Sequence, residues 1–475
     1  MLPLPPEQWA ELTFGCADLG DKRRTKRLVH IATDLSAHTG SSLAESCEGS
    51  LASVEGGYRL IENQAVDPEA IAEAGFQATA HASEDSELIL ALEDSTTLGY
   101  KHSARSELGD LGGPEDSTTK GFWAHSVMLL DAETERTLGL IDQQRWIRDD
   151  SERGKKHKRK QRPYEEKESF KWQKSSENVE RRLGEQMVKT ISVCDREADV
   201  FEYTLYKLNH NQRFIVRATQ NRTLLDDDKR LFDAVAETPV LGSYTITVPQ
   251  RGGRKERKAK LQVKSKSVTI QSPQRPEGRL QPIKVNVVTA QEINNDAEDK
   301  LCWILLTTEP AETFEDCRKV LHFYELRWRI EEFHKAWKTG AGVERQRMQS
   351  ADNLERMAVI LMFVAVRLIQ IREALMLPYI RKETGDEVWH EKTSANQVVS
   401  DDEWQVLWLK MESKKLPDKP PPLIWLFQTI AKLGGWCDSK HTGRPGWLAV
   451  WKGWAKLQLS VEGWRIARQF WGVEM

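Results

Sequence analysis

Apolar and polar positions alternate in different ways along the chain, and they predict a helical start, a β-rich middle and a helical end. In residues 21–37 the apolar Leu28, Ile31 and Leu35 recur on one side of a helix and basic residues occupy the other. Three apolar runs of strand length then follow, with a turn between the second and the third. They predict three adjacent strands, and so a meander, in residues 88–92, 122–130 and 137–146.

The middle of the chain continues with strand patterns. A strand at 188–193, a helix to about residue 208 and a strand at 213–217 form one strand–helix–strand unit. Between 236 and 308 the pattern is β-rich, with further strands predicted at 243–248, 283–288 and 301–307. From about residue 314 the chain is helical, apart from a Pro-rich linker at 414–422.

Composition narrows the class of protein. A length of 475 residues predicts two to four domains, and 39% apolar with 30% charged residues suits a globular protein. None of the six cysteines forms a CxxC pair, so neither a zinc site nor a redox motif is expected. We see no signal peptide and no apolar run long enough to span a bilayer, and we therefore expect a soluble cytoplasmic protein.

The net charge is only −3, but the basic residues are clustered. Five of the seven residues at 21–27 are Lys or Arg, which fits a phosphate-contacting helix or an ordinary solvated helix face. Seven of the ten residues at 153–162 are basic, so we expect 148–175 to be a mobile basic loop that touches DNA or is a plain surface insertion. A third basic cluster, at 251–260, is predicted to form a hairpin tip.

Two aspartates follow apolar strands. Asp94 comes after the run 88–92, and Asp195 comes after 188–193, so each is placed where a strand is predicted to end. A carboxylate at such a place costs free energy unless it has a partner, and a metal ion supplies one. Each aspartate could equally be the N-cap of a helix that follows it.

A third carboxylate lies in a segment without Gly or Pro, residues 324–338. On one continuous helix at about 100° per residue, four polar side chains fall within an arc of roughly 60°. They are Tyr324, Arg327, Glu331 and Lys338. Ile330, Phe333 and Trp337 cluster on a neighbouring face and predict an anchor to the core. A salt-bridged surface helix is the alternative interpretation.

These residues also carry a family resemblance. The spacing Y-x2-R-x3-E-x6-K resembles the signature of the IS-four family of bacterial cut-and-paste transposases. The likeness covers nearly the whole chain, and it includes RWRIEEFHKAWKTGAG around Glu331. Other shared motifs are LGDKRRTKRLV near the start, EDSTTLGYKH, GFWAHSVMLL, VCDREADV, and AKLGGWCDSKHTG near the end.

The resemblance implies a fold and an active site. The fold expected is α/β, with a ribonuclease-H-like core, an inserted antiparallel β-sheet, and helical N- and C-terminal domains. The separation of 136 positions between Asp195 and Glu331 agrees with such an insertion. The family's catalytic triad falls on Asp94, Asp195 and Glu331, which would hold two Mg²⁺ ions, with Mn²⁺ as a substitute. Asp94 would bridge the two ions.

The resemblance also implies DNA contacts. Tyr324, Arg327, Lys338 and Arg217 match phosphate ligands, and Trp303 matches a tryptophan that stacks on a flipped base, although a core tryptophan is the alternative. The transposon end would be contacted by Arg23, Arg24, Arg27 and Arg59 of the N-terminal helices. The basic hairpin would grip the DNA backbone through Arg254, Lys255, Arg257 and Lys258. The partner end would be contacted by His334, Lys335, Arg345 and Arg347.

The domains expected are 1–70 for DNA binding, 71–372 for catalysis with an insertion at about 220–300, and 373–475 for dimerisation. Ten of the seventeen tryptophans lie beyond residue 385, and Trp447, Trp451 and Trp454 form one helical stripe, for core packing or for a homodimer interface. The function expected is cut-and-paste transposition in the bacterial cytoplasm, near the nucleoid. Two rivals are a nuclease that cuts without joining and a domesticated DNA-binding protein that no longer cuts.

Overall fold

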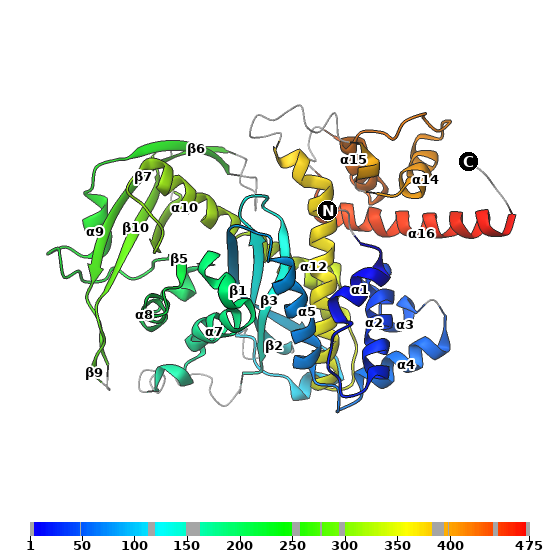
Figure 1. The fold of residues 1–475 in the computed structure, drawn as a ribbon, viewed down its shortest axis with the longest axis horizontal. Helices are drawn as coiled ribbons and strands as arrows, with labels where there is room; N and C mark the ends of the chain where they lie inside the picture. The colour runs from blue at the N-terminus through cyan, green and yellow to red at the C-terminus, as the bar shows by residue number, and fades with distance from the viewer. Residues whose placement is uncertain are drawn as a thin grey trace.

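One mixed β-sheet runs through the middle of the molecule, and helices flank it at both ends of the chain (Figure 1). The coordinates are a computed structural model. It describes residues 4–471 except for 48, 113–118, 149–161, 249–256, 276–277, 294–299, 382–393, 398 and 440–444.

Within the described residues, nine strands are joined in the order β3-β2-β1-β4-β5-β11-β10-β7-β6. A short separate hairpin is formed by β8 (Gln274–Arg275) and β9 (Gly278–Arg279). The nine strands of the sheet are β1 (Ile89–Tyr100), β2 (Lys120–Asp131), β3 (Thr137–Trp146), β4 (Thr190–Cys194), β5 (Arg213–Arg217), β6 (Gly242–Val248), β7 (Arg257–Ile270), β10 (Ile283–Glu292) and β11 (Cys302–Thr307).

The first five strands define the core of the fold. β1, β2 and β3 pair antiparallel as the predicted meander, while β4 pairs parallel with β1 and β5 parallel with β4. The parallel pairs need crossover connections, and the helices α7 (Lys171–Leu183) and α8 (Phe201–Asn209) supply them. This order is that of a ribonuclease-H-like core, so the predicted fold class is confirmed.

The inserted strands do not stand apart from this core. β11 pairs antiparallel with β5, and β10, β7 and β6 follow edge to edge, so the insertion lengthens the core sheet. Figure 1 shows this extension at the left of the view. In β7 and β10 buried residues alternate with more exposed ones, as expected for strands with one covered face.

Helices make up the two ends of the chain and cover the sheet. The N-terminal helices are α1 (Pro6–Phe14), α2 (Lys22–Ala37), α3 (Leu43–Ser46), α4 (Leu51–Ile61) and α5 (Pro68–Ala82). A short helix, α9 (Leu231–Ala236), packs on β7. The helices after the sheet are α10 (Phe314–Leu326), α11 (Arg329–Lys335), α12 (Ala351–Arg381), α14 (Asp401–Glu412), α15 (Leu423–Leu433) and α16 (Trp447–Trp471).

Strand β1 is buried on both faces, and its alternating side chains enter two different cores. Leu90 and Leu92 belong to the main core, which α12 and the N-terminal helices share. Ile89 and Ala91 point the other way, into a cluster that contains Val179 of α7. Because side chains alternate along a strand, Asp94 lies on the face of Leu90 and Leu92.

Helix α12 joins the ends of the chain to the core. Arg356 of α12 is buried, and its guanidinium donates hydrogen bonds to the carbonyls of Val66 (2.6 Å) and Ile61 (3.2 Å). At the other end, Trp451 of α16 donates to the carbonyl of Leu368 at 3.1 Å. Trp451 is therefore a core residue of this chain, and the core-packing interpretation holds for it. The side chain of Trp447 lies outside the described residues.

The predicted basic loop at 148–175 is shorter than expected. Residues 164–166 and 168–170 form 3₁₀ turns, and α7 begins at Lys171. Tyr164 and Phe170 hold these turns together through an edge-to-face ring contact with centroids 5.3 Å apart. The prediction of a mobile loop was wrong for this part, because aromatic contacts outweigh the local charge. Residues 149–161, which carry most of the basic cluster, lie outside the described residues.

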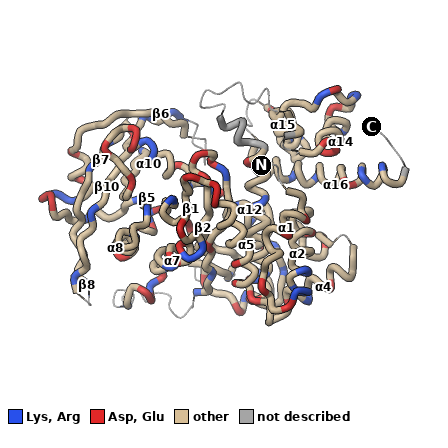
Figure 2. The backbone as a smooth tube through the Cα atoms, viewed as in Figure 1, with Lys and Arg blue, Asp and Glu red and all other residues tan. Residues whose placement is uncertain are grey.

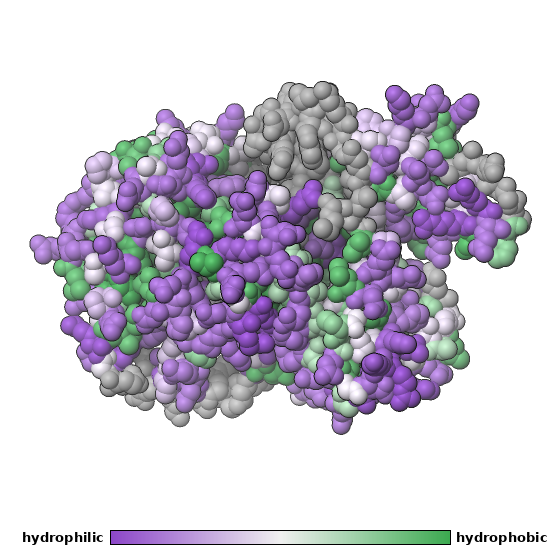
Figure 3. All heavy atoms as spheres, viewed as in Figure 1, coloured by the Kyte–Doolittle hydropathy of each residue, from purple (hydrophilic) through white to green (hydrophobic). Residues whose placement is uncertain are grey.

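Polar side chains cover most of the face seen in Figure 3. Within the part of the chain that the structure describes, none of the helices combines the length and the apolarity needed to cross a membrane.

A buried hydrogen-bond cluster fixes α11 to α12 and β3. The carboxylate of Glu373 accepts from the amide (2.8 Å) and the hydroxyl (2.7 Å) of Thr137 and from the guanidinium of Arg329 (2.8 Å). The Glu373 side chain is 4% exposed and that of Arg329 11% exposed. Removing Glu373 takes the acceptor from the amide and the hydroxyl of buried Thr137, and Arg329 keeps only its contacts with Glu135.

We therefore expect Glu373→Ala to lower the free energy of unfolding by about 3 kcal/mol in a denaturant titration. Glu55→Ala is the control, because it breaks an exposed pair with Arg59 and should cost less than about 1 kcal/mol. Equal effects of the two substitutions would show that the cluster around Glu373 does not hold these elements together.

Candidate active site

The pairing of β1 with β4 places the two aspartates next to each other. The parallel register joins Leu92 to Val193 and Glu93 to Cys194, and the next residue on each chain is Asp94 or Asp195. Adjacent strands lie about 4.8 Å apart, so the two carboxylates leave the sheet as neighbours. The structure thus brings together two residues that are about a hundred positions apart in the sequence.

Asp94 does not lie at the end of its strand. The structure extends β1 to Tyr100, and Asp94 pairs with Ser126 in the middle of the β1–β2 ladder. The expectation of a strand end at Asp94 was wrong because the polar residues 95–97 continue the pairing with β2. It follows that Asp94 is not a helix cap. Asp195 does cap a 3₁₀ turn, since its carboxylate accepts a hydrogen bond from the amide of Glu197 at 2.8 Å.

Arg327 brings the third carboxylate to the pair. Its guanidinium donates to Glu331 of α11 at 2.9 Å and lies 3.6 Å from a carboxylate oxygen of Asp94. The Arg327 side chain is 13% exposed and that of Asp94 19% exposed, so this contact is shielded from water. One cation therefore bridges two of the three predicted catalytic carboxylates.

The electrostatics of Asp94 reflect its surroundings. Burial raises the pKa of Asp94 most, the cation of Arg327 lowers it, and the negative charges of Asp195 and Glu331 raise it again, to about 7. The charges of both carboxylates thus raise the pKa of Asp94, as expected where three acids lie close together. At neutral pH Asp94 lies close to its own pKa and lacks the positive charge needed to hold it fully ionised.

The three carboxylates are not drawn together tightly. In the described parts of the chain, no group of three or more His, Cys, Asp or Glu side chains is close enough to hold one metal ion. The position of Arg327 between Asp94 and Glu331 accounts for this spacing. All three side chains offer oxygen donors, which are the ligands that Mg²⁺ and Mn²⁺ prefer.

The segment 324–338 is not one regular α-helix, contrary to the sequence prediction. Helix α10 ends at Leu326, a tightened turn at Arg327 and Trp328 follows, and α11 begins at Arg329. After α11 the chain widens into a π-helical turn at Ala336–Gly340. Buried Trp337 donates to the carbonyl of Ala358 at 3.1 Å, so contacts with α12 override the regular helical spacing.

Lys338 lies in this π turn, half-buried. Burial lowers the pKa of Lys338, and the carboxylate of Glu344 raises it. Beside it His334 is fully buried, and burial together with the charges of Lys338 and Arg327 lowers the pKa of His334 to about 3. A neutral, buried His334 cannot reach DNA in this structure, so the predicted DNA contact of His334 is wrong for this conformation.

Three of the predicted phosphate and base ligands, Arg217, Trp303 and Tyr324, form a series of contacts that ends at Arg327. The rings of Trp303 and Tyr324 meet edge to face with centroids 5.8 Å apart, and the Arg327 guanidinium lies 5.9 Å from the Tyr324 ring. Arg217 donates to the carbonyl of Cys302, next to Trp303, at 3.0 Å. Trp303 is half-buried on β11, so part of its ring is open at the surface.

The basic residues of the N-terminal helices lie on one side of the molecule. Arg23 is 91% exposed and pairs with the helix cap Asp21, and Arg59 is 80% exposed. The guanidinium of Arg27 packs so closely on Gly56 of α4 that a Cβ there would lie 2.6 Å from it. Arg24 donates to the carbonyl of Leu19 at 2.9 Å. Figure 2 shows these basic residues gathered where α2 and α4 meet.

The other predicted DNA contacts have mixed placements. Lys335, Arg345, Arg347 and Lys258 are exposed. Arg257 is engaged within the chain, where it pairs with the buried carboxylate of Glu292. Arg254 and Lys255 lie outside the described residues.

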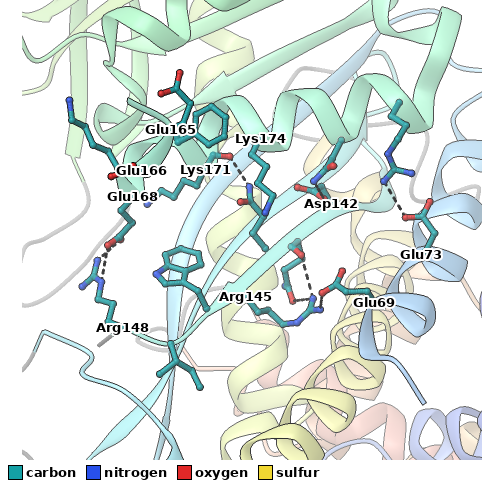
Figure 4. A pocket seen from close by; sticks show the side chains of 18 of the residues that line it. Glu69, Glu73, Asp142, Arg145, Arg148, Glu165, Glu166, Glu168, Lys171 and Lys174 are labelled. Atoms are coloured by element: carbon teal, nitrogen blue, oxygen red, sulfur yellow. Dashed lines mark hydrogen bonds and ion pairs between the residues drawn. The ribbon is translucent and has the colours of Figure 1, made fainter. Parts of the chain in front are cut away.

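A separate hollow of about 1190 Å³ lies along the outer edge of β3, between α5 and α7 (Figure 4). Its cations are already paired: Arg145 contacts Glu69 and Glu355, Arg148 contacts Glu168, and Lys171 lies 3.2 Å from Glu197. Carboxylates and cations line it in similar numbers, so it does not resemble a phosphate-binding surface. The candidate active site lies elsewhere, at Asp94.

Sequence reasoning missed the polar residues behind Asp94. His125 of β2 is fully buried, lies 3.6 Å from the Glu93 carboxylate and contacts the Ser95 hydroxyl at 3.0 Å. These residues flank Asp94 on the opposite face of the sheet. The signal was present, because Glu93 directly follows an apolar run and directly precedes Asp94, where an unpaired carboxylate is costly.

Comparisons with known proteins identify both ends of the chain. A family model described as "Transposase DNA-binding" matches residues 6–66, and a model described as "Transposase Tn5 dimerisation domain" matches residues 386–473. Among solved structures, a piggyBac transposase synaptic complex with hairpin DNA is similar with a TM-score of 0.41 and 9% identity. That similarity covers 81% of this chain and 77% of the other.

The helices around Arg23 and Arg59 thus form a transposase DNA-binding domain, and the tryptophan-rich helices after α12 form a transposase dimerisation domain. Together with the ribonuclease-H-like core, these domains define a DNA transposase, an enzyme that cleaves and joins DNA. The dimerisation domain is similar to that of the Tn5 transposase, and the two family models cover residues 6–66 and 386–473 of the chain.

The raised pKa of Asp94 gives a prediction for the protein without metal. Between about pH 4 and about pH 7 the unfolded chain releases this proton while the folded chain keeps it, so stability falls as pH rises through that window. Asparagine cannot ionise, so a variant with asparagine at position 94 does not lose this stability as pH rises. We expect Asp94→Asn to increase the free energy of unfolding by about 2–4 kcal/mol at about pH 8 in EDTA, and by less at about pH 5.

Thermal unfolding at the two pH values tests this expectation. Glu315→Gln serves as the control, because that residue is exposed on the first turn of α10. A variant at position 94 that is less stable than wild type at about pH 8 would show that Arg327 compensates the buried charge fully.

Proposed function

We propose that Asp94, Asp195 and Glu331 form the catalytic centre of this transposase and hold two divalent metal ions, Mg²⁺ or Mn²⁺. The observation that carries the proposal is that Asp94 of β1 has both other carboxylates near it: Arg327 contacts Asp94 and Glu331 of α11, and Asp195, directly after β4, lies beside Asp94 in the register. Asp94, Asp195 and Glu331 would hold these ions through their carboxylate oxygens. When bound, the ions activate the attacking oxygen and stabilise the leaving oxygen of a phosphodiester.

The donor set suits such ions. It is all oxygen and negatively charged. Burial of Asp94 and the charges of Asp195 and Glu331 raise the pKa of Asp94 to about 7, although Arg327 lowers it. Divalent cations held here would add positive charge beside Asp94 and favour its ionised form. The Arg327 guanidinium would then be available for a phosphate oxygen.

The side chains around the carboxylates hold the DNA strand in place. Arg327, Lys338 and Arg217 contribute positive charge toward phosphate oxygens, and Tyr324 contributes a hydroxyl donor. Their gathering near Trp303 supports this role. Because phosphate contacts carry no sequence information, these residues position the strand, and selection of the end rests with the N-terminal domain.

The reaction proposed is cut-and-paste transposition through a DNA hairpin. One strand is nicked, the freed 3′-hydroxyl attacks the opposite strand, water reopens the hairpin, and the 3′-hydroxyl attacks target DNA. A hairpin requires sharp bending of the strand, and a base flipped onto Trp303 relieves it, with stacking worth roughly 1–3 kcal/mol. The partly open ring of Trp303 beside Tyr324 supports such a contact.

The proposed assembly is a homodimer on two transposon ends. Arg23, Arg24, Arg27 and Arg59 contact the end through the domain 1–70, and Lys258 with the basic cluster at 251–260 grips the backbone. Lys335, Arg345 and Arg347 of the catalytic domain, 71–372, contact the partner end. The domain 373–475 joins the protomers, which is supported by the exposed Leu459, Ile466 and Phe470 on α16.

The deciding experiment measures cleavage of a labelled donor DNA that carries the element's own ends, with Mg²⁺. Wild type is expected to give a nick, a hairpin and a blunt double-strand break. Glu331→Ala should bind the ends as wild type does and cleave at least about 1000-fold more slowly, because the metal centre loses a ligand. Glu332→Gln, at the neighbouring position of α11, is the matched control and should retain cleavage.

Other outcomes separate the rival functions. Normal cleavage by Glu331→Ala would remove Glu331 from the catalytic centre. Cutting by wild type without a hairpin or a strand-transfer product would indicate a nuclease. Binding of the ends that is equal with and without Mg²⁺, with no cleavage, would indicate a DNA-binding protein that has lost its chemistry.

A further inference from the structure

Two residues of the proposed active site leave neighbouring strands side by side. The last pair in the parallel ladder of β4 with β5 directly precedes Asp195 on one strand and Arg217 on the other. Two positions earlier, Val193 and Ile215 are both buried in the main core. Because side chains alternate along extended chains, Asp195 and Arg217 project on that same face, where Asp94 also lies. A proposed metal ligand and a proposed phosphate ligand are thus neighbours across two strands.

Beyond this ladder the two chains lose their regular pairing. A 3₁₀ turn at residues 196–198 follows Asp195 and ends at Asp199. After Arg217, residues 218–222 have no regular secondary structure. On its other side β5 pairs with β11, which does not fix the distance of β5 from β4. The separation of β4 and β5 at the active site therefore needs another contact.

The side chain of Asp199 supplies that contact. It is buried, with 1% of the side chain exposed. One carboxylate oxygen accepts hydrogen bonds from the amide (2.6 Å) and the hydroxyl (3.1 Å) of Thr219 and from the amide of Gln220 (3.0 Å). The other oxygen accepts from the guanidinium of Arg222. A single carboxylate thus binds the loop after Arg217 at four points.

The backbone of Asp199 binds the same loop. Its carbonyl accepts from the side-chain amide of Gln220 at 3.1 Å and from Arg222 at 3.0 Å. Among the described residues, every hydrogen bond that joins segment 195–199 to segment 218–222 has Asp199 as its acceptor. Gln220 is exposed, so packing does not hold this part of the loop. The loop therefore takes its position from Asp199.

We propose that Asp199 is a positioning residue of the active site: its buried carboxylate fixes the separation of Asp195 and Arg217, and so the place of the DNA phosphate relative to the metal centre. The inference rests on the proposed roles of Asp195 and Arg217. Asp199 itself touches neither metal nor DNA. A carboxylate suits this task, because a charged acceptor forms stronger hydrogen bonds than a neutral one and the guanidinium of Arg222 balances its charge.

A double-mutant cycle tests whether Asp199 acts through Arg217. Asp199→Asn is nearly isosteric, but it offers only one acceptor oxygen and no charge. It is combined with Arg217→Ala, and single-turnover cleavage of pre-bound transposon ends is measured for the full-length protein in Mg²⁺. Asp233→Asn is the matched control, because exposed Asp233 accepts from the Asn221 side chain of the same loop at 3.3 Å. Thermal unfolding checks that each variant folds.

Asp199→Asn should bind the ends as wild type does and cleave about tenfold more slowly, because the loop after Arg217 is no longer fixed. In the Arg217→Ala background the same substitution should slow cleavage less than about twofold, because no phosphate ligand is left there to position. The Mg²⁺ concentration that gives half the maximal rate should stay within about twofold of the wild-type value. Asp233→Asn should follow wild type.

An Asp199→Asn rate equal to that of wild type would overturn the proposal. Equal losses in both backgrounds would also overturn it, because residues that act independently have additive effects. A raised Mg²⁺ requirement would place the effect at the metal ligands instead of Arg217, and wild-type cleavage by Arg217→Ala would remove the premise. Failure of the proposed function is distinguishable from these results, since it would appear as normal cleavage by Glu331→Ala in the same assay.

If Asp199→Asn does not fold, Arg222→Gln takes its place in the cycle. That substitution removes a donor to Asp199 and leaves the carboxylate itself in place. A loss of rate that disappears in the Arg217→Ala background would support the proposal, and a loss of equal size in both backgrounds would overturn it.

Discussion

The burial of Asp94 beside two further carboxylates is the constraint on which the active site depends. Each acid would lose hydration at this place, and each repels the others, so the cluster needs positive charge close by. Arg327 supplies part of it from the turn between α10 and α11. Burial and the charges of the two neighbouring carboxylates still raise the pKa of Asp94, and this supports the proposal that the site holds divalent cations.

The rest of the fold keeps these groups in place. Glu373 of α12 binds Arg329 at the start of α11, and Glu344 binds the amide of Gly99 on β1. Both contacts use a buried or half-buried carboxylate to join elements that are far apart in the sequence. Such contacts are expensive to break, because each leaves an unpaired polar group behind. Strand β1 and helix α11 are therefore held by contacts outside the proposed active site as well as by Arg327.

Helix α12 is the common support of the DNA-binding, catalytic and dimerisation domains. Arg356 docks the end of α4 through the carbonyl of Ile61, and Leu368 receives the hydrogen bond of Trp451 from the C-terminal helices. Between these two points α12 packs against the π turn that carries Lys338. A movement of either end domain against α12 would thus displace the π turn that carries Lys338, the proposed phosphate ligand. Binding of the transposon end would in this way affect the active site.

The sequence by itself determined the strands of the meander, the positions of Asp94, Asp195 and Glu331 relative to apolar runs, and the class of fold. These features are local, or they follow from the spacing of motifs along the chain. Only the tertiary structure decided that β1 runs on to Tyr100, that His334 is buried and neutral, and that the helix around Glu331 is tightened at Arg327 and widened at Lys338. Each of these depends on a partner from elsewhere in the chain, such as β2 or α12, and long-range packing energy outweighs the local preference that a sequence pattern expresses.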